Sequence, residues 1–234
     1  MMKSYKICDL VVNMDLKYSM IRDRAEKYLI EKSDSPDVII ESDEDSISRI
    51  KEIAPHLSKA ECEVIHTTSM FYRRLLSYDG FMLHSSAVCV DNKAYLFSAN
   101  SGTGKSTHTT QWLKLFGDKA YIINDDKPAL KIENGCVYVY GTPWSGKSDL
   151  NLNVRVPLQG ICVLERSKNN FIEPLDNGVA VYKLMNQTLR PPFEAHMDKL
   201  LSLLDIVITK TPIWRMGCNI STEAAQMAYD AMSE

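Results

Sequence analysis

The chain has 234 residues, of which 45% are hydrophobic and 24% charged, so it can build one sizeable core or one large and one small domain. A formal net charge of -3, with both signs mixed along the sequence, argues against nucleic acid or a membrane surface as the main partner. No stretch approaches the roughly 20 apolar residues of a membrane span, and the six cysteines form no CxxC pair typical of zinc ligation. We therefore expect a cytoplasmic protein with reduced cysteines.

The first 78 residues are predicted to form a small α+β module. Its expected elements, in chain order, are a strand over 4–13, a helix over 18–30 and a strand over 38–40. Ser58 followed three residues later by Glu61 is typical of a helix N-terminus, and the apolar spacing carries this helix to Gly80. We expect this long helix to join the module, residues 1–78, to a core formed by residues 79–234.

The core is predicted to open with a hairpin. Two apolar strands, 81–90 and 94–98, flank the turn tripeptide 91–93. Beyond the hairpin, the hydrophobic spacing predicts helix 107–116, strands 120–123, 129–132, 137–140 and 160–164, and helices 180–186, 195–204 and 222–232. This order of strands and helices indicates an α/β core.

The phosphate-loop pattern occurs twice, at residues 99–106 and 141–148. Phosphate binding requires successive backbone N–H groups around the anion, glycines that let the chain approach it, and a helix N-terminus directly after the loop. It also requires a lysine that reaches the outer phosphates and a hydroxyl that ligates Mg²⁺. The first match meets all these conditions. The residues expected to bind the nucleotide are Asn100, Ser101, Gly102, Thr103, Gly104, Lys105, Ser106 and Thr107.

The second match lacks the features of a phosphate loop. It contains Pro143, which has no N–H group, and the bulky Trp144, and the alternating residues after it do not suit a helix. Two interpretations stay open for this segment, a loop that lines the site and an inert turn. As a site-lining loop it would present Trp144 and Lys147 to a substrate.

The paired carboxylates Asp125 and Asp126 follow Lys105 by 20 and 21 residues, at the end of the next predicted strand. A strand–helix–strand unit returns the chain to the same edge of a sheet, so we expect the pair to face the phosphate loop. There, one carboxylate could hold Mg²⁺ and the other could act as a base. The alternative is a solvated turn, which the neighbouring phosphate loop makes the weaker interpretation. His84, taken alone, is more typical of a strand histidine whose hydrogen bonds are satisfied than of a catalytic group.

Residues 81–128 resemble the catalytic core of HPr kinase/phosphorylase and its relatives, the kinases that share a fold with phosphoenolpyruvate carboxykinase. The motifs that carry the resemblance are Leu83-His84-Ser85-Ser86-Ala87-Val88, Ala94-Tyr95-Leu96-Phe97, Ser101-Gly102-Thr103-Gly104-Lys105-Ser106-Thr107 and Asn124-Asp125-Asp126. The resemblance implies an α/β fold, namely a mixed-sheet P-loop kinase core of this type with a small α+β N-terminal module.

The resemblance also implies a role for each residue at a motif position. Lys105 would grip the nucleotide phosphates and Ser106 would ligate Mg²⁺. Asp125 would be the base, Asp126 would bind the metal or orient the acceptor, and His84 would contact the transferred phosphate.

The sequence therefore predicts an ATP- and Mg²⁺-dependent kinase that phosphorylates a hydroxyl of a peptide, a protein or a small molecule. Two alternatives stay open, a catalytically silent nucleotide-binding regulator and an enzyme like phosphoenolpyruvate carboxykinase. Arg155 could supply positive charge to the transferred phosphoryl group or be an exposed strand arginine. HPr kinases form oligomers, so the resemblance is compatible with a homo-oligomer, and the oligomeric state stays open.

Overall fold

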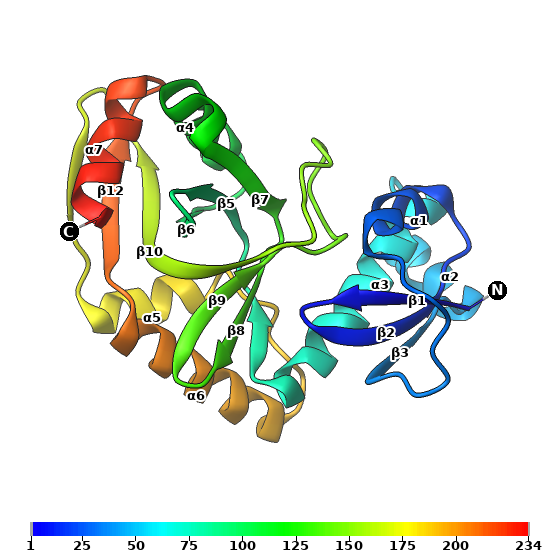
Figure 1. The fold of residues 1–234 in the computed structure, drawn as a ribbon. Coiled ribbons are helices and arrows are strands. Elements are labelled where there is room, and N and C mark those ends of the chain that lie inside the picture. The colour runs from blue at the N-terminus through cyan, green and yellow to red at the C-terminus, as the bar shows by residue number, and fades with distance from the viewer. Residues whose placement is uncertain (1, 234) are drawn as a thin grey trace.

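A computed structural model describes residues 2–233, which form two β-sheets with helices packed against each (Figure 1). The smaller sheet has three strands in the order β1-β2-β3, and the larger one is a nine-stranded mixed sheet that curls. The protein is therefore a mixed α/β protein. Within residues 2–233, no helix is both long and apolar enough to cross a membrane.

The small sheet and its helices come first in the chain. Their bounds are β1 (Lys3–Ile7), β2 (Leu10–Asp15), α1 (Ser19–Ala25), β3 (Val38–Glu41), α2 (Glu44–Ile53) and α3 (Lys59–Leu75). The single strand predicted over 4–13 is wrong, because the chain reverses at Cys8 and Asp9, which both take left-handed φ angles of 53° and 62°. The result is an antiparallel hairpin, β1–β2, on which β3 pairs parallel to β2.

Helix α3 begins as predicted. The Ser58 side chain accepts a hydrogen bond from the Glu61 N–H, and the Glu61 carboxylate accepts one from the Ser58 N–H. Helix α2 was not predicted from the sequence. There, the Asp43 side chain accepts hydrogen bonds from the N–H groups of Asp45 and Ser46.

The large sheet runs in the order β4-β8-β9-β10-β6-β5-β7, with β12 also pairing β10 and β11 pairing β12. Its strands are β4 (Gly80–Met82), β5 (Ser85–Val90), β6 (Lys93–Ser98), β7 (Ala120–Asp126), β8 (Ala129–Glu133), β9 (Cys136–Tyr140), β10 (Arg155–Arg166), β11 (Phe171–Pro174) and β12 (Ile213–Cys218). The first strand of the predicted hairpin divides into β4 and β5, which pair with different neighbours. Strand β10 joins the two parts of the curl, since it pairs antiparallel to β9 at its start and parallel to β6 and β12 further on.

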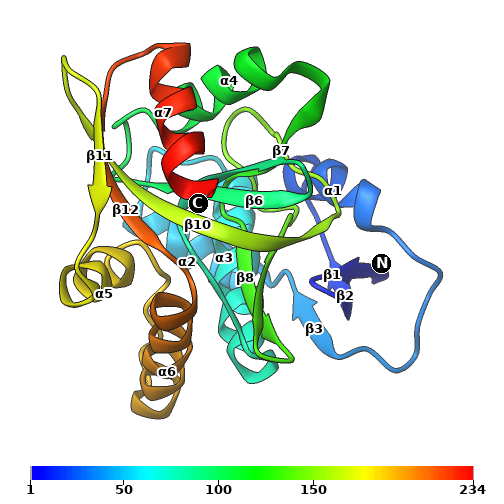
Figure 2. The same ribbon diagram turned by 60° about the vertical axis from the view of Figure 1, so that its left-hand side comes forward.

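Helices cover both faces of the large sheet. They are α4 (Lys105–Phe116) and α7 (Thr222–Ser233) on one face and α5 (Asn177–Met185) and α6 (Glu194–Lys210) on the other (Figures 1 and 2). Alternate residues of β6 show this division, because Leu96 packs in the cluster with α5 and α6 whereas Phe97 packs in the cluster with α4 and α7. The expected α/β core is thus present.

The connection that positions the site runs from β6 through α4 to β7. Strand β5 lies between β6 and β7 and is antiparallel to both, so β6 and β7 point in the same direction. Ser85 at the start of β5 stands opposite Ser98 on one side and opposite Asp126 on the other. The end of β7 therefore lies two strands from the end of β6, at the same edge of the sheet.

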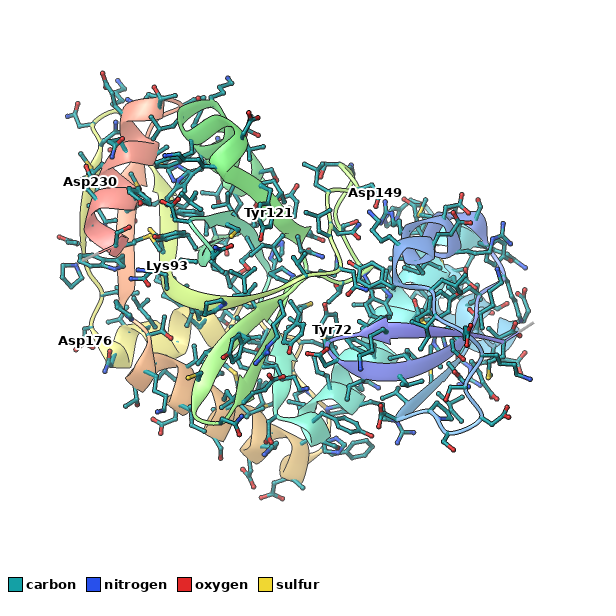
Figure 3. All side chains as sticks on the ribbon, in the orientation of Figure 1. Tyr72, Lys93, Tyr121, Asp149, Asp176 and Asp230 are labelled. Carbon is teal, nitrogen blue, oxygen red and sulfur yellow. The ribbon has the colours of Figure 1, made fainter. Side chains whose placement is uncertain are left out.

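One aromatic cluster joins the small sheet to the large one. Phe71 and Tyr72 of α3 contact Trp144, and all three belong to the same buried cluster as strands β1 to β3 and Tyr140 of β9. In Figure 3, Tyr72 lies in the region between the two sheets. The division into residues 1–78 and 79–234 stays a prediction.

Candidate functional site

The glycine-rich loop follows β6 directly and leads into α4. Gly102 and Gly104 have φ angles of 77° and 122°, which residues with a side chain adopt only with strain. A Cβ atom on either glycine would meet nothing within 4 Å, so the space beside both is open. Helix α4 has no side-chain cap at its N-terminus, and its first N–H groups stay available to an anion.

Lys105, the first residue of α4, has a buried side chain inside this loop. Its Nζ donates a hydrogen bond to the Ala99 carbonyl oxygen at 2.9 Å, which ties the end of the loop back to its beginning. Burial lowers the pKa of Lys105, and the negative charges of Asp126 and Asp125 oppose this shift. The ammonium thus lies within electrostatic reach of the acidic pair.

A cavity of about 270 Å³ brings the loop and the acidic pair together. Its lining consists of His84, Ser101, Gly102, Gly104, Lys105, Ser106, Thr107, Asp125 and Asp126. All of them are candidate site residues predicted from the sequence. The other two loop residues, Asn100 and Thr103, do not line this cavity. Thr103 lines two neighbouring cavities, and Asn100 lines one of those two.

Asp125 is held in place by its backbone and by a neighbouring loop. It is 6% exposed, its N–H donates to the Leu150 carbonyl oxygen at 2.9 Å, and its own carbonyl oxygen accepts from the Gly146 N–H at 2.6 Å. The side-chain oxygen Oδ2 accepts a hydrogen bond from the Ser148 hydroxyl at 2.8 Å. Ser148 was not selected as a site residue, although it ends the second match to the phosphate-loop pattern.

Two donor groups contact the Asp126 carboxylate, one at each oxygen. His84 Nε2 lies 3.0 Å from Oδ1, and the Lys127 ammonium contacts Oδ2. Burial raises the pKa of Asp126, but the hydrogen bond from His84 and the charge of Lys127 outweigh it and hold the pKa well below the usual range. The residue adopts a φ of 118°, which is strained for a residue with a side chain and is tolerated where the surroundings determine it.

His84 connects the acidic pair to the glycine-rich loop. Its Nδ1 lies 2.9 Å from Gln187 Oε1, and Gln187 Nε2 donates to Asn100 Oδ1 at 3.1 Å. The chain of contacts therefore runs from Asp126 through His84 and Gln187 to Asn100. No feature of the sequence pointed to Gln187, which is distant along the chain and reaches His84 only through the tertiary fold.

The segment 141–154 lies against the acidic pair. A Cβ atom on Gly146 would lie 3.1 Å from the Asp125 carbonyl oxygen and 3.2 Å from the Asp126 Cβ. Figure 3 labels Asp149 on this segment, which extends between β7 and α1. We call residues 141–154 the second loop. It lines the site, and no helix follows it.

Two residues expected at the substrate lie elsewhere. Trp144 is 0% exposed, stacks on Phe71 with ring centroids 4.6 Å apart, and donates from Nε1 to the Thr67 hydroxyl at 3.0 Å. It is a core residue and cannot face a substrate. Arg155 pairs with Glu133 at 2.6 Å and stacks on the Tyr138 ring, and it lines none of the cavities around the loop.

Lys147 does lie at the site. It lines a second cavity of about 720 Å³ between the small sheet's helices and the acidic pair. This cavity shares Ser101, Ser106, Asp125 and Asp126 with the first one. Its other walls are formed by Met20 and Arg24 of α1, by Leu57, Glu61, Val64 and Ile65 at or near α3, and by Lys127, Ser145, Gly146, Lys147 and Ser148.

A third cavity, of about 650 Å³, lies on the opposite side of the loop. It shares Gly102, Gly104 and Thr107 with the first cavity. Its remaining walls are Thr103, His108, Arg166, Ser167, Lys168, Cys218, Asn219 and Ile220. The first cavity thus adjoins both of the others, and it lies at the glycine-rich loop and the start of α4.

Metal-ligating side chains are sparse at this site. Among residues 2–233, no group of three or more His, Cys, Asp or Glu side chains is arranged to hold a metal ion. All six cysteines are free thiols. Any metal at the acidic pair would therefore take part of its coordination from a ligand or from water.

The fold and the site define a mixed α/β protein in which a glycine-rich loop and an acidic pair face one cavity at the edge of a curled sheet. The model of one protein family, described as "SynChlorMet cassette protein ScmC", matches residues 51–220. The chain belongs to the ScmC family.

The solved structure of the HPr(Ser) kinase/phosphatase from Coxiella burnetii is similar to the chain, with 11% sequence identity and a TM-score of 0.37. The similarity covers 65% of this chain and 94% of that one. No curated protein matches the chain. Membership in the HPr kinase family stays a prediction.

Proposed function

We propose that this protein is an ATP- and Mg²⁺-dependent kinase that transfers the γ-phosphate to a hydroxyl of a peptide, a protein or a small molecule. One observation carries the proposal: a single cavity is lined by the glycine-rich loop, by Lys105 and by both carboxylates of the acidic pair. A terminal phosphate bound in this cavity would have a cation, a base and a helix N-terminus around it, as phosphoryl transfer requires.

The contacts of the two carboxylates support a division of roles. Asp125 has one oxygen in a hydrogen bond with a hydroxyl, which is the arrangement of a base with its acceptor. Asp126 is ionised and interacts with cationic or hydrogen-bond-donating groups at both oxygens, which suits a group that attracts a cation. His84, which contacts Asp126 through Nε2 and Gln187 through Nδ1, would orient Asp126.

The residues around Asp126 fit a magnesium ion. The Lys127 ammonium at Oδ2 stands in for a cation at the carboxylate, and Ser106 of the loop lines the same cavity. Mg²⁺ commonly binds through one or two protein ligands together with phosphate oxygens, so Asp126 and Ser106 would suffice. When bound, the ion would neutralise charge on the phosphate oxygens.

The two flanking cavities support an assignment of the rest of the substrates. The cavity of about 650 Å³, beside the loop and the first turn of α4, would take the nucleoside. The cavity of about 720 Å³ would take the acceptor, because it contains Asp125 and is open to Lys147 and to apolar side chains of α1 and α3. The N-terminal module would then form one wall of the acceptor site.

The proposal is tested by two variants with different expected defects. Lys105→Ala should weaken the binding of Mg²⁺-ATP by roughly 10- to 100-fold, because a charge-assisted contact to phosphate is lost. Asp125→Asn should retain nucleotide binding but lower transfer by about 10²- to 10⁴-fold, because the base is removed. Calorimetric titration measures binding, and γ-labelled ATP with a panel of amino acids and short peptides measures transfer.

Ser202→Ala is a matched control and should behave as the unmodified protein, since the hydroxyl of this exposed serine of α6 donates to the Asp198 carbonyl oxygen of the same helix. ATP binding without product from any acceptor, and without any effect of Asp125→Asn, would favour a catalytically silent regulator. Turnover of oxaloacetate would favour an enzyme like phosphoenolpyruvate carboxykinase.

A further inference from the structure

A hydroxyl group of the protein itself already contacts the proposed base. Ser148 Oγ donates to Asp125 Oδ2 at 2.8 Å, and Ser148 lines the cavity of about 720 Å³ together with Ser106 of the glycine-rich loop. Asp125 and Ser106 also line the cavity assigned to the phosphates. The Asp125 carboxylate therefore contacts the Ser148 hydroxyl and also lines the cavity assigned to the phosphates.

The second loop is held in this position by the N-terminal module. Arg24 of α1 donates to the Ser145 carbonyl oxygen at 3.0 Å and pairs with Asp149 at 3.3 Å. Tyr28 donates to the Asn151 side chain at 2.9 Å, on the other side of Ser148. Contacts on both sides of Ser148 thus keep its hydroxyl at the acidic pair and lower the entropy cost of reaction there.

The backbone of the second loop adds a further constraint. The Gly146 N–H donates to the Asp125 carbonyl oxygen, and the Asp125 N–H donates to the Leu150 carbonyl oxygen. These two hydrogen bonds lie on either side of Ser148 in the sequence. The serine is nevertheless exposed, and it lines the cavity of about 720 Å³.

We propose that Ser148 is a self-phosphorylation site, at which the protein transfers the terminal phosphoryl group of a bound nucleoside triphosphate to its own second loop. This inference rests on the proposed kinase function. In the reaction the Ser148 oxygen forms a bond to the γ-phosphorus while the bond from that phosphorus to the β,γ-bridging oxygen breaks. The hydroxyl proton passes to Asp125, and the nucleoside diphosphate leaves.

The surroundings of Ser148 suit the product as well. Lys147, the preceding residue, is exposed and lines the same cavity, where its charge acts on the Glu61 carboxylate, and its ammonium could pair with a phosphoserine. The added phosphate would fill part of the acceptor cavity. Phosphorylation of Ser148 would therefore compete with binding of an external acceptor.

The test is mass spectrometry of the full chain after incubation with Mg²⁺-ATP, followed by peptide mapping. We expect one phosphoryl group on Ser148 in the unmodified protein and in Ser202→Ala, and none in Ser148→Ala or Asp125→Asn. Ser148→Thr, which keeps a hydroxyl, should restore labelling in part. Circular dichroism and thermal unfolding check that each variant folds.

A mixing experiment tests whether the transfer occurs within one chain. Unmodified protein is incubated with an excess of a size-tagged Lys105→Ala chain, which keeps Ser148 but lacks the proposed phosphate contact. We expect the label only on the unmodified chain, at a rate per chain that is independent of dilution. Label on the tagged chain, or on a residue other than Ser148, would overturn the inference.

ADP formation, followed in the same samples, separates this inference from the proposed function. ADP that forms through Lys105 and Asp125 without any phosphate on the chain would overturn self-phosphorylation alone. Absence of nucleotide binding and of ADP formation would overturn both.

Discussion

His108 lies in α4, three residues beyond Lys105, and shows how a buried side chain couples this helix to pH. Its Nε2 accepts a hydrogen bond from Trp112 Nε1 at 3.2 Å, its ring packs on Phe97, and its Nδ1 is buried without a hydrogen-bond partner in residues 2–233. Burial lowers the pKa of His108 from 6.5 to about 4. The imidazole is therefore neutral in the folded protein at neutral pH.

This shift predicts a loss of stability in mild acid. The unfolded chain binds a proton at His108 below pH 6.5, whereas the folded chain binds one only below about pH 4. The free energy of unfolding is therefore unaffected above pH 6.5 and decreases as the pH falls from 6.5 to about 4. The full difference is on the order of 3 kcal/mol. Urea unfolding at pH 7 and pH 5 measures the part of it that is lost above pH 5, about 2 kcal/mol, and His108→Phe should flatten the pH dependence.

The carboxylates with lowered pKa values act below the pH range of this measurement. Asp43, Glu61, Asp126 and Glu133 have folded-state pKa values below their ordinary values of 3.8 and 4.5, so the stability that they contribute is lost as the pH falls below about 5. An equal loss of stability between pH 7 and pH 5 in His108→Phe and in the unmodified protein would contradict the prediction.

At the scale of elements, α1 depends on a side chain from another helix. Tyr18 at its N-terminus provides no side-chain cap. Glu63 of α3 takes that place, since its fully buried carboxylate accepts from the N–H groups of Lys17 at 2.7 Å and Tyr18 at 2.9 Å and from the Ser42 hydroxyl. A charge buried without a cation is tolerated here because three donors surround it and one helix N-terminus faces it.

Glu63→Ala should therefore destabilise the protein by roughly 3 kcal/mol, because two backbone N–H groups and one hydroxyl lose their acceptor in a buried position. Glu52→Ala, at an exposed position of α2, is the control and should change the free energy of unfolding by less than about 0.5 kcal/mol. Chemical denaturation measures both. Similar values for the two variants would show that water replaces the carboxylate at no cost.

At the scale of the whole molecule, the two sheets share one buried aromatic cluster. Trp144 of the second loop packs on Phe71 and Tyr72 of α3, and the Tyr72 hydroxyl donates to the Lys127 carbonyl oxygen. The N-terminal module thus contacts the segment that carries the acidic pair. Separation of the module would expose large apolar surfaces on both sides.

We accordingly expect residues 1–78 and 79–234 to unfold together. Trp144→Ala should lower the free energy of unfolding by about 3 to 5 kcal/mol, because it leaves a large cavity and removes the hydrogen bond to Thr67. Native-state hydrogen exchange in urea can follow the amides of β1–β3 and of β5–β7 separately. Opening of the small sheet at clearly lower urea than the large one would contradict the expectation and would mark two independent domains.

The elements nearest the loop were the most accurately predicted from the sequence. The hairpin, the glycine-rich loop, α4 and β7 follow one another within residues 81–126, and their turn and cap residues act over a few positions. For the second loop the sequence left two interpretations open, and the suggestion that Trp144 could face a substrate is wrong, because Trp144 is buried. The sequence around Trp144 does not indicate that α3, which lies far away along the chain, packs against the ring.

The sequence by itself determined the phosphate-loop pattern, the α/β order of elements and the acidic pair, because these depend on backbone conformation and spacing along a few tens of residues. Only the tertiary structure decided that Gln187 reaches His84, that Glu63 caps α1 and that Ser148 contacts Asp125. These contacts join residues 23 to 103 positions apart. They depend on the curl of the large sheet and on the aromatic cluster between the sheets, which arise from packing across the molecule and leave no local pattern.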